Sequence, residues 1–197
     1  MEQKTGSPLV LASTSVYRRT LLARLMIPFT VFSPQVDESP ALGEAAAATA
    51  ARLALLKAQA AAQSFRAHLV VGSDQVAECD GVRMDKPLAH EVAVRQLRLL
   101  SGHSAVFHTA VTLLESASGR VQTEVVATRV RFRKVDDAQI ERYLRKEPAY
   151  DCAGSAKSEG LGIALIEAME TTDPTALVGL PLIALSRMLR NEGVEVP

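Results

Sequence analysis

Tryptophan is absent from this sequence, and aromatic residues make up only 4% of its 197 residues. A chain so poor in aromatic rings lacks the stacking platform on which proteins bind single-stranded nucleic acids. Charge of either sign is not in excess, because 22 lysines and arginines balance 22 aspartates and glutamates. No broad electrostatic attraction to nucleic acid or to a membrane surface follows from this balance. We therefore expect neither nucleic acid nor a membrane as a partner.

Cysteine and long apolar runs are also scarce. Cys79 and Cys152 are the two cysteines of the sequence, too few for a disulfide framework or a zinc site. We expect both as free thiols in a reducing compartment. No segment approaches the length of a membrane span, and residues 1–7 are polar, without the apolar core of a signal peptide. These absences predict a cytoplasmic protein.

The order of the expected elements predicts a mixed α/β fold. The length fits one domain over residues 1–197, or two closely packed lobes, with loosely ordered ends near 1–7 and 192–197. Strands alternate with helices in the first half, and a hairpin sits in the second half. The expected strands are 9–12, 29–33, 69–71, 106–114 and 121–135, and the expected helices are 17–26, 44–64, 91–100, a segment reaching Arg145 and one ending near Arg190. We expect a hairpin turn at Asp80-Gly81, and Asp136 or Asp137 as the cap of the helix that reaches Arg145. In such sheets, polar loops that follow strands hold ligands.

The segment of residues 11–19, Leu-Ala-Ser-Thr-Ser-Val-Tyr-Arg-Arg, is the most informative part of the chain. It ends an apolar strand with small hydroxylic residues and then opens a helix with two arginines. Hydroxyls, free backbone N–H groups and arginine suit a phosphate group. The segment lacks the glycines of a Walker or Rossmann loop. Small hydroxylic residues are also ordinary helix caps, so capping alone remains an equal reading.

Three further polar clusters lie in loops, at strand ends or as single charges within apolar helices. They are Glu38 with Lys57, Asp74-Gln75 with Lys86, and Ser155 to Glu159. Together with the first segment they supply the hydroxyls, cations and carboxylates that magnesium-assisted phosphate chemistry requires.

The order of these motifs closely resembles the Maf family of nucleotide pyrophosphatases, from about Leu9 to Arg190. The resemblance rests on Ala-Ser-Thr-Ser-x-x-Arg-Arg, Val-Asp-Glu, Lys57 within a helix, Gly-Ser-Asp-Gln, Lys-Pro, Cys-Ala-Gly-Ser-x-x-x-Glu-Gly-Leu-Gly and Asp-Pro-Thr-Ala-Leu-Val-Gly-Leu-Pro. It implies a mixed β-sheet flanked by helices, similar to the ITPase fold, with a cleft between two lobes. It also implies a divalent cation, Mg²⁺ or Mn²⁺, and hydrolysis of a nucleoside triphosphate to its monophosphate and pyrophosphate.

Two of these motifs resemble the branch of the family that acts on 7-methyl-GTP. They are Gly-Ser-Asp-Gln and the late loop with Glu159, whereas the branch acting on dTTP and UTP usually carries threonine after the aspartate. The implied role is removal of a noncanonical nucleotide before its incorporation into nucleic acid. Activity on dTTP and UTP, a broad pyrophosphatase, and a regulatory nucleotide-binding protein that affects septation are the alternatives. A homodimer is the default expectation for an enzyme of this size.

The resemblance assigns a role to each candidate side chain. Asp74 is the predicted catalytic carboxylate, and a hydrogen bond in a turn at the strand end is the alternative. Glu38 is predicted to hold the metal together with Asp74, and a solvated loop position is its alternative. Lys57, the single cation in an apolar helix, has snorkelling as its alternative. The predicted phosphate ligands are Ser13, Ser15, Arg18, Lys57 and Lys86.

Base selectivity is assigned to Tyr17, Gln75 and Glu159. Methylation at N7 makes the guanine ring cationic, which attracts an aromatic face such as that of Tyr17. A carboxylate can accept from the N1 and N2 edge of guanine, which suits Glu159, and Gln75 offers both a donor and an acceptor. The alternative for Tyr17 is helix packing, and for Glu159 a solvated loop position.

The chain departs from the family pattern at two positions. Val16 stands where proline is frequent, and Asp85 stands where glycine often precedes Lys-Pro. Loss of the proline is expected to be harmless. Aspartate tolerates a positive φ better than most residues, should the backbone at 85 need one.

Overall fold

The computed structural model describes residues 8–196 and contains a mixed seven-stranded sheet with the order β2-β1-β3-β5-β6-β7, in which β4 pairs with β3. The chain divides into two compact units. The first comprises the chain up to Asp74, Thr109–Val126 and the segment from Asp173 onward. The second comprises Gln75–His108 and Ala127–Thr172. The expected class, a mixed α/β sheet flanked by helices, is confirmed.

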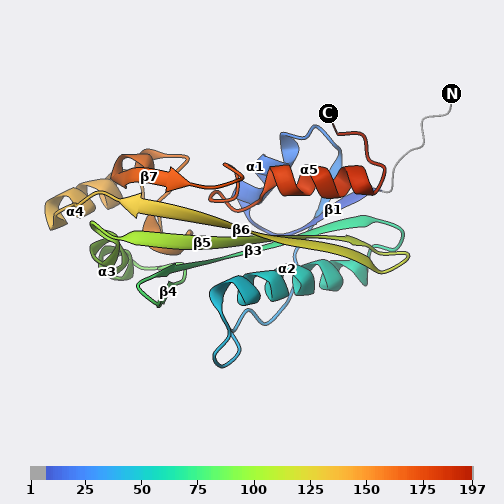
Figure 1. Cartoon of the computed structure of the whole chain (residues 1–197), viewed down its shortest axis with the longest axis horizontal. Helices are drawn as coiled ribbons and strands as arrows, with labels where there is room; N and C mark the ends of the chain where they lie inside the picture. The colour runs from blue at the N-terminus through green and yellow to red at the C-terminus, as the bar shows by residue number, and fades with distance from the viewer. Residues whose placement is uncertain (1–7, 197) are drawn as a thin grey trace. The chain divides into compact units, whose positions relative to one another are not determined.

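The first unit is built on three parallel strands, and the middle one is buried on both faces. β1 (Leu9–Ala12) lies between β2 (Phe29–Phe32) and the first half of β3 (Leu69–Cys79) and is parallel to both. All four residues of β1 are buried, which explains its continuous apolar sequence. Helix α2 (Ala46–Ala62) covers one face of this sheet, and α1 (Val16–Ala23) and α5 (Leu182–Asn191) cover the other (Figure 1).

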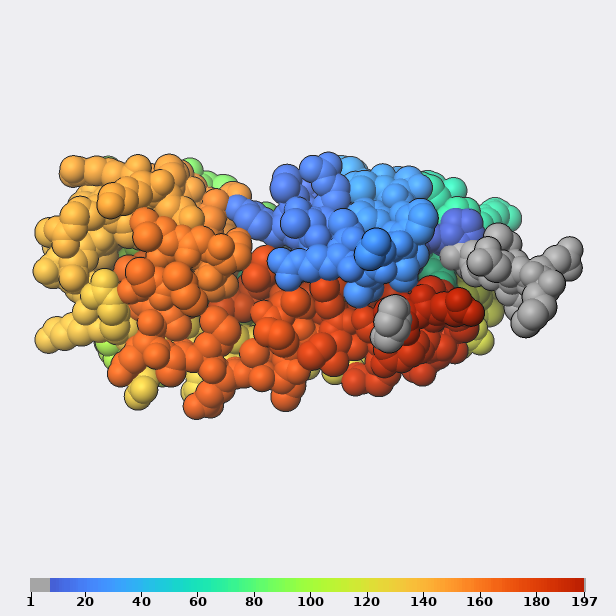
Figure 2. Space-filling view, turned by 90° about the horizontal axis from the view of Figure 1, so that it is seen from above, coloured from blue at the N-terminus to red at the C-terminus, as the bar shows by residue number. Residues whose placement is uncertain are grey.

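The alternation of side chains along β1 and β3 divides the core of the first unit in two. Leu11 and Val71 point into the cluster with Leu21 of α1 and Leu185 of α5. Val10, Val70 and other residues of the opposite face pack with Ala58 and Ala61 of α2. Figure 2 shows α1 and α5 side by side on one surface, as the shared cluster requires.

The second unit contains the remaining elements. They are β4 (Val82–Met84), α3 (His90–Leu100), α4 (Asp137–Lys146), the 3₁₀ turns Ala153–Ser155 and Leu161–Leu165, and β7 (Ile166–Glu170). β4 forms a hairpin with the end of β3 across Asp80-Gly81, as predicted. Asp136 caps α4 in a capping box with Gln139, which settles the expectation of Asp136 or Asp137. β5 (Ser104–Glu115) and β6 (Arg120–Phe132) contribute residues to both units, as β3 does.

Several elements differ from the expectations. β3 does not end at residue 71 but continues to Cys79, so Asp74 lies inside a strand rather than in a turn after it. Strand β7 was not predicted, because it is a mostly exposed segment of five residues. Helix α1 stops at Ala23, three residues early, and the chain turns through Met26 with φ of 55° before Pro28.

Part of the C-terminal segment belongs to the core of the first unit. Val194 and Val196 pack against the core of the first unit. Looser order is expected near residues 1–7 and 192–197; of these, residues 1–7 and 197 lie outside the described residues. Among the helices of residues 8–196, none combines the length and the apolar character that crossing a membrane requires.

Candidate active site

The loop between β1 and α1 presents the hydroxyls of the first motif. Ser15 is the N-cap of α1 and its Oγ accepts from the backbone N–H of Arg18 at 3.4 Å. Ser13 is buried, and its Oγ accepts from the backbone N–H of Ser15 at 3.2 Å. The capping reading of this segment is therefore confirmed, and its role toward phosphate stays a prediction. Val16 occupies the first position of the helix, where proline would be accommodated equally well.

Arg18 points from α1 to the loop before α5. Its Nε donates to the carbonyl oxygen of Gly179 at 2.9 Å, and its Nη1 lies 3.5 Å from Ser13 Oγ. Burial lowers the pKa of Arg18, whereas the negative charges of Asp74 and Glu38 act in the opposite direction. The guanidinium therefore lies in the electrostatic field of both predicted metal ligands. Arg19, the next residue of the motif, is exposed.

Lys57 is buried and bridges two carboxylates. Its Nζ lies 2.6 Å from Asp74 Oδ1 and 2.9 Å from Glu38 Oε1. The side chain of Lys57 is only 6% exposed, so the snorkelling alternative is wrong. Asp74 is likewise buried, whereas the side chain of Glu38 is 60% exposed. A buried cation therefore joins a buried carboxylate to one that reaches solvent.

Gly72 explains how a lysine of α2 reaches a strand so closely. A Cβ added at this position would lie 2.1 Å from the carbonyl oxygen of Ala54 and 2.8 Å from the backbone nitrogen of Ala58. Only glycine allows α2 to approach β3 at this point. Lys57 directly precedes Ala58 on α2, and Asp74 follows Gly72 by two positions on β3. The close approach therefore brings Lys57 beside Asp74. The small residues of this contact thus determine the placement of the charges.

A clamp on the loop before α2 supports Glu38. Arg52 of α2 donates to both carboxylate oxygens of Glu44, at 2.7 and 2.8 Å, and to the carbonyl oxygen of Ser39 at 3.0 Å. The Arg52 bonds lower the pKa of Glu44 to about 2. Because Ser39 follows Glu38 directly, this clamp restricts the backbone from which Glu38 reaches Lys57.

The carboxylates of Glu38 and Asp74 fit a magnesium-type cation. Their oxygens contact the same Lys57 nitrogen, so the two carboxylates lie close together in the first unit, with the ammonium between them. Within residues 8–196 no group of three or more His, Cys, Asp or Glu side chains could hold a metal ion. Mg²⁺ needs no such cage, because it binds through one or two carboxylates together with waters and substrate phosphates. The pair therefore suits an ion that is completed by a nucleotide.

The remaining candidates are distributed over both units. Tyr17 is half-buried on α1 in the first unit, next to Arg18 in sequence. Gln75 is half-buried on β3, Lys86 is exposed before the buried Pro87, and Glu159 is exposed, all in the second unit. Asp85 has no positive φ, so aspartate at that position needs no special backbone tolerance. The part that these second-unit residues play in a site stays a prediction.

Two side chains that the sequence did not single out organise the loop of Glu159. Glu147, after α4, accepts from the backbone N–H groups of Leu161 at 3.1 Å and Gly162 at 3.0 Å. Tyr143 Oη accepts from the backbone N–H of Lys157 at 3.1 Å. A Cβ added at Gly160 would lie 2.1 Å from Glu147 Oε1, so a side chain at this position would displace the Glu147 carboxylate. Long-range bonds of this kind leave no periodic signal in a sequence.

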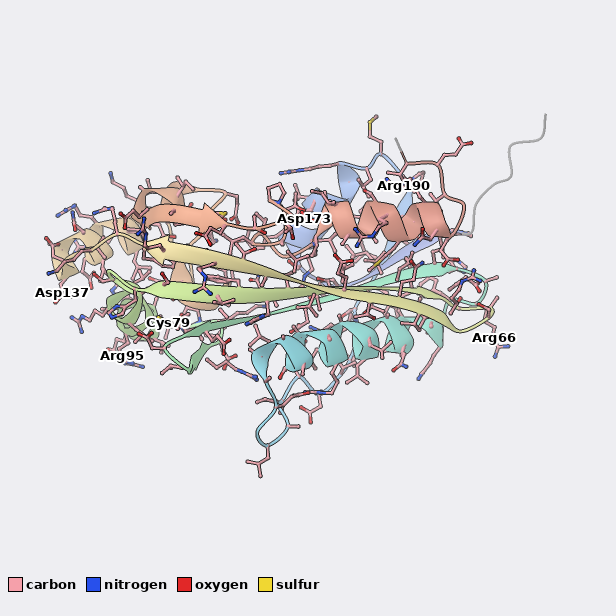
Figure 3. The ribbon with its side chains drawn as sticks, in the orientation of Figure 1. Arg66, Cys79, Arg95, Asp137, Asp173 and Arg190 are labelled. Carbon is pink, nitrogen blue, oxygen red and sulfur yellow. The ribbon has the colours of Figure 1, made fainter. Side chains whose placement is uncertain are left out.

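The cysteines are not placed for nucleophilic chemistry. Cys79 is buried at the end of β3 (Figure 3), and burial raises the pKa of its thiol. Burial also raises the pKa of Cys152 to about 12. Both are free thiols that stay protonated at neutral pH, which agrees with the expectation of incidental thiols.

The fold and the charges together define an α/β protein that gathers a lysine, an arginine and two carboxylates in one unit, as a phosphate-processing site does. Residues 8–192 match the model of the Maf-like protein family. The chain belongs to the Maf family.

Several relatives that share one name match nearly the whole chain. A protein of Thiobacillus denitrificans named 7-methyl-GTP pyrophosphatase is 60% identical over 98% of this chain and 96% of the relative. A protein of the same name from Methylobacillus flagellatus is 56% identical over 96% of this chain and 98% of its own length. A third, from Burkholderia thailandensis, is 57% identical over 94% and 87%.

Proposed function

We propose that this protein is a nucleoside triphosphate pyrophosphatase that hydrolyses 7-methyl-GTP to 7-methyl-GMP and pyrophosphate. The observation that carries the proposal is the buried Lys57, which brings Asp74 and Glu38 together. Identities of 52–60% to proteins named 7-methyl-GTP pyrophosphatase support the choice of substrate. The role in the cell is removal of a noncanonical nucleotide before it enters nucleic acid.

The residues of the first unit hold the triphosphate. Arg18 offers a planar fork of N–H donors to phosphate oxygens, and the hydroxyls of Ser13 and Ser15 add further contacts. Lys57 directs two of its donors at carboxylates, which leaves the third for a phosphate oxygen. Lys86 neutralises the remaining charge. This machinery lowers the barrier by positioning the nucleotide and by stabilising the charge that develops on its oxygens.

Asp74 orients the attacking water and accepts its proton. The water oxygen forms a bond to the α-phosphorus, the bond from that phosphorus to the oxygen bridging the α- and β-phosphates breaks, and pyrophosphate leaves with the bridging oxygen. Glu38 and Asp74 would hold the divalent cation, Mg²⁺ or Mn²⁺, which when bound lowers the pKa of water and offsets phosphate charge.

Base selectivity comes from Tyr17, Gln75 and Glu159. The ring of Tyr17 attracts the cationic 7-methylguanine, and Glu159 accepts from its N1 and N2 edge. Uracil and thymine lack that pair of donors, so they gain less from Glu159.

The cytoplasm is the proposed compartment. The free thiols of Cys79 and Cys152 support a reducing environment. A homodimer stays a prediction of the sequence analysis.

Turnover of four nucleotides tests the function. Purified protein with Mg²⁺ is incubated separately with 7-methyl-GTP, GTP, UTP and dTTP, and the products are separated by ion-exchange chromatography. We expect the highest kcat/KM for 7-methyl-GTP, with pyrophosphate as the product. Faster turnover of UTP or dTTP, release of orthophosphate, or tight binding without turnover contradicts the proposal, and the last result favours a regulatory role.

A further inference from the structure

The carbonyl oxygen of Gly179 is shared by two side chains of the candidate site. It accepts from Arg18 Nε at 2.9 Å and from the hydroxyl of Ser73 at 2.9 Å. Ser73 is buried and precedes Asp74 on β3, whereas Arg18 lies on α1. A carbonyl oxygen has two lone pairs, so both are in use. This carbonyl oxygen thus connects Arg18, the predicted phosphate ligand, to strand β3, which carries Asp74, the predicted general base.

We propose that Gly179 is a positioning residue, whose carbonyl orients the Arg18 guanidinium for phosphate and fixes β3 at Ser73. The proposal rests on the function proposed above. It assigns a task to the late Asp-Pro-Thr-Ala-Leu-Val-Gly-Leu-Pro motif, for which the sequence analysis named no role.

The bond at Nε determines which donors Arg18 has left. A guanidinium is planar, and anchoring Nε fixes both the position of the group and the direction of its plane. Nη1 donates one N–H to Ser13 Oγ at 3.5 Å, and the other N–H groups of the two terminal nitrogens serve phosphate oxygens. Because the side chain is ordered before the nucleotide binds, less conformational freedom is lost on binding.

The conformation of Gly179 sets the direction of its carbonyl. Its φ is +121°, in the region that residues with a Cβ rarely adopt. Space is not the constraint, because an added Cβ would meet Arg18 Nε at 3.6 Å and Cγ at 3.7 Å, which are ordinary contacts. A substitution at this position therefore acts by turning the backbone, and with it the carbonyl.

The loop around Gly179 is held at its beginning and at its end. The loop begins at Asp173, whose side chain is buried, with the residue 2% exposed. In space, Asp173 lies beside the N-terminus of α5 (Figure 3), where it accepts from the backbone N–H of Ile183 at 2.7 Å. Thr175 Oγ1 lies 2.7 Å from Asp173 Oδ1 and 2.8 Å from the carbonyl oxygen of Leu180, and it accepts from the backbone N–H of Leu182 at 2.8 Å. This closed network keeps the Gly179 carbonyl in place.

A double-mutant cycle tests the proposal. The variants are Gly179→Ala, Arg18→Ala and the double variant, with Gly193→Ala as the matched control. Gly193 also has a positive φ, +77°, but an added Cβ there would meet nothing within 4 Å. The readouts are Kd for inorganic pyrophosphate with Mg²⁺, kcat/KM for 7-methyl-GTP, and Tm.

The positioning role predicts coupling between the two residues. We expect Gly179→Ala to weaken pyrophosphate binding and kcat/KM about 10- to 100-fold relative to the Gly193→Ala control. In the Arg18→Ala background the same substitution should cost less than about twofold, because its target is gone. A full loss in both backgrounds, or the same activity as the Gly193→Ala control, overturns the proposal.

A second pair of variants decides the matter if Gly179→Ala does not fold. Thr175→Val removes the hydroxyl that holds the loop, and Thr175→Ser keeps it. We expect Thr175→Val to weaken pyrophosphate binding, with no further loss in the Arg18→Ala background, and Thr175→Ser to restore binding. Equal binding by both variants contradicts the role of the loop.

The pyrophosphate measurement separates this inference from the proposed function. If the wild-type protein binds pyrophosphate but does not hydrolyse 7-methyl-GTP, the proposed function fails and the cycle still decides the role of Gly179. If it hydrolyses 7-methyl-GTP but the cycle shows no coupling, only the inference fails. Wild-type protein that does neither contradicts both.

Discussion

Two buried aspartates of the first unit differ in what they contact. Asp173 is 2% exposed and accepts from the backbone N–H groups of Thr175 at 3.1 Å and Ile183 at 2.7 Å. Asp74 is 6% exposed and accepts from the ammonium group of Lys57, which also contacts Glu38. Burial alone therefore does not distinguish a carboxylate that supports the fold from one that serves chemistry.

The kind of donor makes the difference. Backbone N–H groups are fixed by the helix and the loop, so a carboxylate that accepts from them contributes to stability and cannot change partners. An ammonium at the end of a flexible stem can be redirected to another anion, such as a phosphate. The attraction within a buried ion pair compensates for little more than the free energy of desolvating its two charges, so such a pair contributes little to stability. The surroundings of Asp74 thus suit the catalytic role proposed for it, and the surroundings of Asp173 suit a helix cap.

The substitution of Asp74 by asparagine sharpens this comparison most. It preserves the shape of the side chain but removes the group that accepts the proton of water. We expect Asp74→Asn to lower kcat about 10²- to 10⁴-fold, the usual worth of a general base. Because Lys57 keeps Glu38 as a partner, Tm should change by only a few degrees. A near-normal kcat would show that Asp74 is not the general base.

Removal of Lys57 breaks the contact from its other side. Lys57→Met leaves Asp74 buried without its cation, which typically costs about 3–5 kcal/mol of unfolding free energy. The double variant with Asp74→Asn should recover most of that stability but none of the activity. Denaturant unfolding and turnover measure the two effects, and a double variant no more stable than Lys57→Met contradicts this account.

The same asparagine substitution at position 173 is the matched contrast. The asparagine side chain would have one acceptor oxygen, and its amide would point donors at the N–H groups of the loop and of α5. We expect Asp173→Asn to lower the free energy of unfolding by about 2–4 kcal/mol. Its kcat, measured well below Tm, should fall less than about tenfold. A larger kcat loss than that of Asp74→Asn, at unchanged stability, would reverse the assignment of the two aspartates.

In the second unit, the carboxylate of Glu147 accepts from backbone N–H groups as Asp173 does in the first unit. Glu147 accepts from Leu161 and Gly162, and a glutamine can satisfy only one of these N–H groups. We expect Glu147→Gln to lower the ratio of kcat/KM for 7-methyl-GTP over UTP about 3- to 10-fold, since the loop carries Glu159. Glu141→Gln, on α4, is the control and should leave the ratio unchanged. An unchanged ratio in both variants would show that the loop does not determine base selectivity.

The thiol of Cys152 provides the smallest expected effect. A pKa raised to about 12 means that the thiolate forms only above pH 11 or so, and at pH 8 its fraction is roughly a thousandfold below that of an ordinary thiol. Alkylation by iodoacetamide at pH 8 should be slow in the native protein and fast in guanidinium. Rapid alkylation of the native protein would contradict the burial of this thiol.

Local signals in the sequence were sufficient for part of the fold. The strand at Leu9–Ala12, the cap at Ser15 and the capping box at Asp136 follow from short patterns of residue types. They could be predicted because apolar runs and small hydroxylic residues act on their own neighbours.

The contacts that assemble the site depend on distant residues. The burial of Lys57 follows from the approach of α2 to Gly72, and helical periodicity does not reveal which strand a helix meets. The part of Gly179 depends on a bond to Arg18, 161 positions earlier. A glycine and a proline just before a helix were a usable signal for a special loop, but not for its partner.

The incorporation of oxygen from ¹⁸O-labelled water tests the central claim most directly. The wild-type protein and Asp74→Asn are incubated side by side with 7-methyl-GTP and Mg²⁺, and the products are analysed by mass spectrometry. The account predicts one labelled oxygen in the 7-methyl-GMP of the wild-type reaction, unlabelled pyrophosphate, and almost no labelled product from Asp74→Asn. Label in the released pyrophosphate, or labelled 7-methyl-GMP from Asp74→Asn at the wild-type rate, would contradict it.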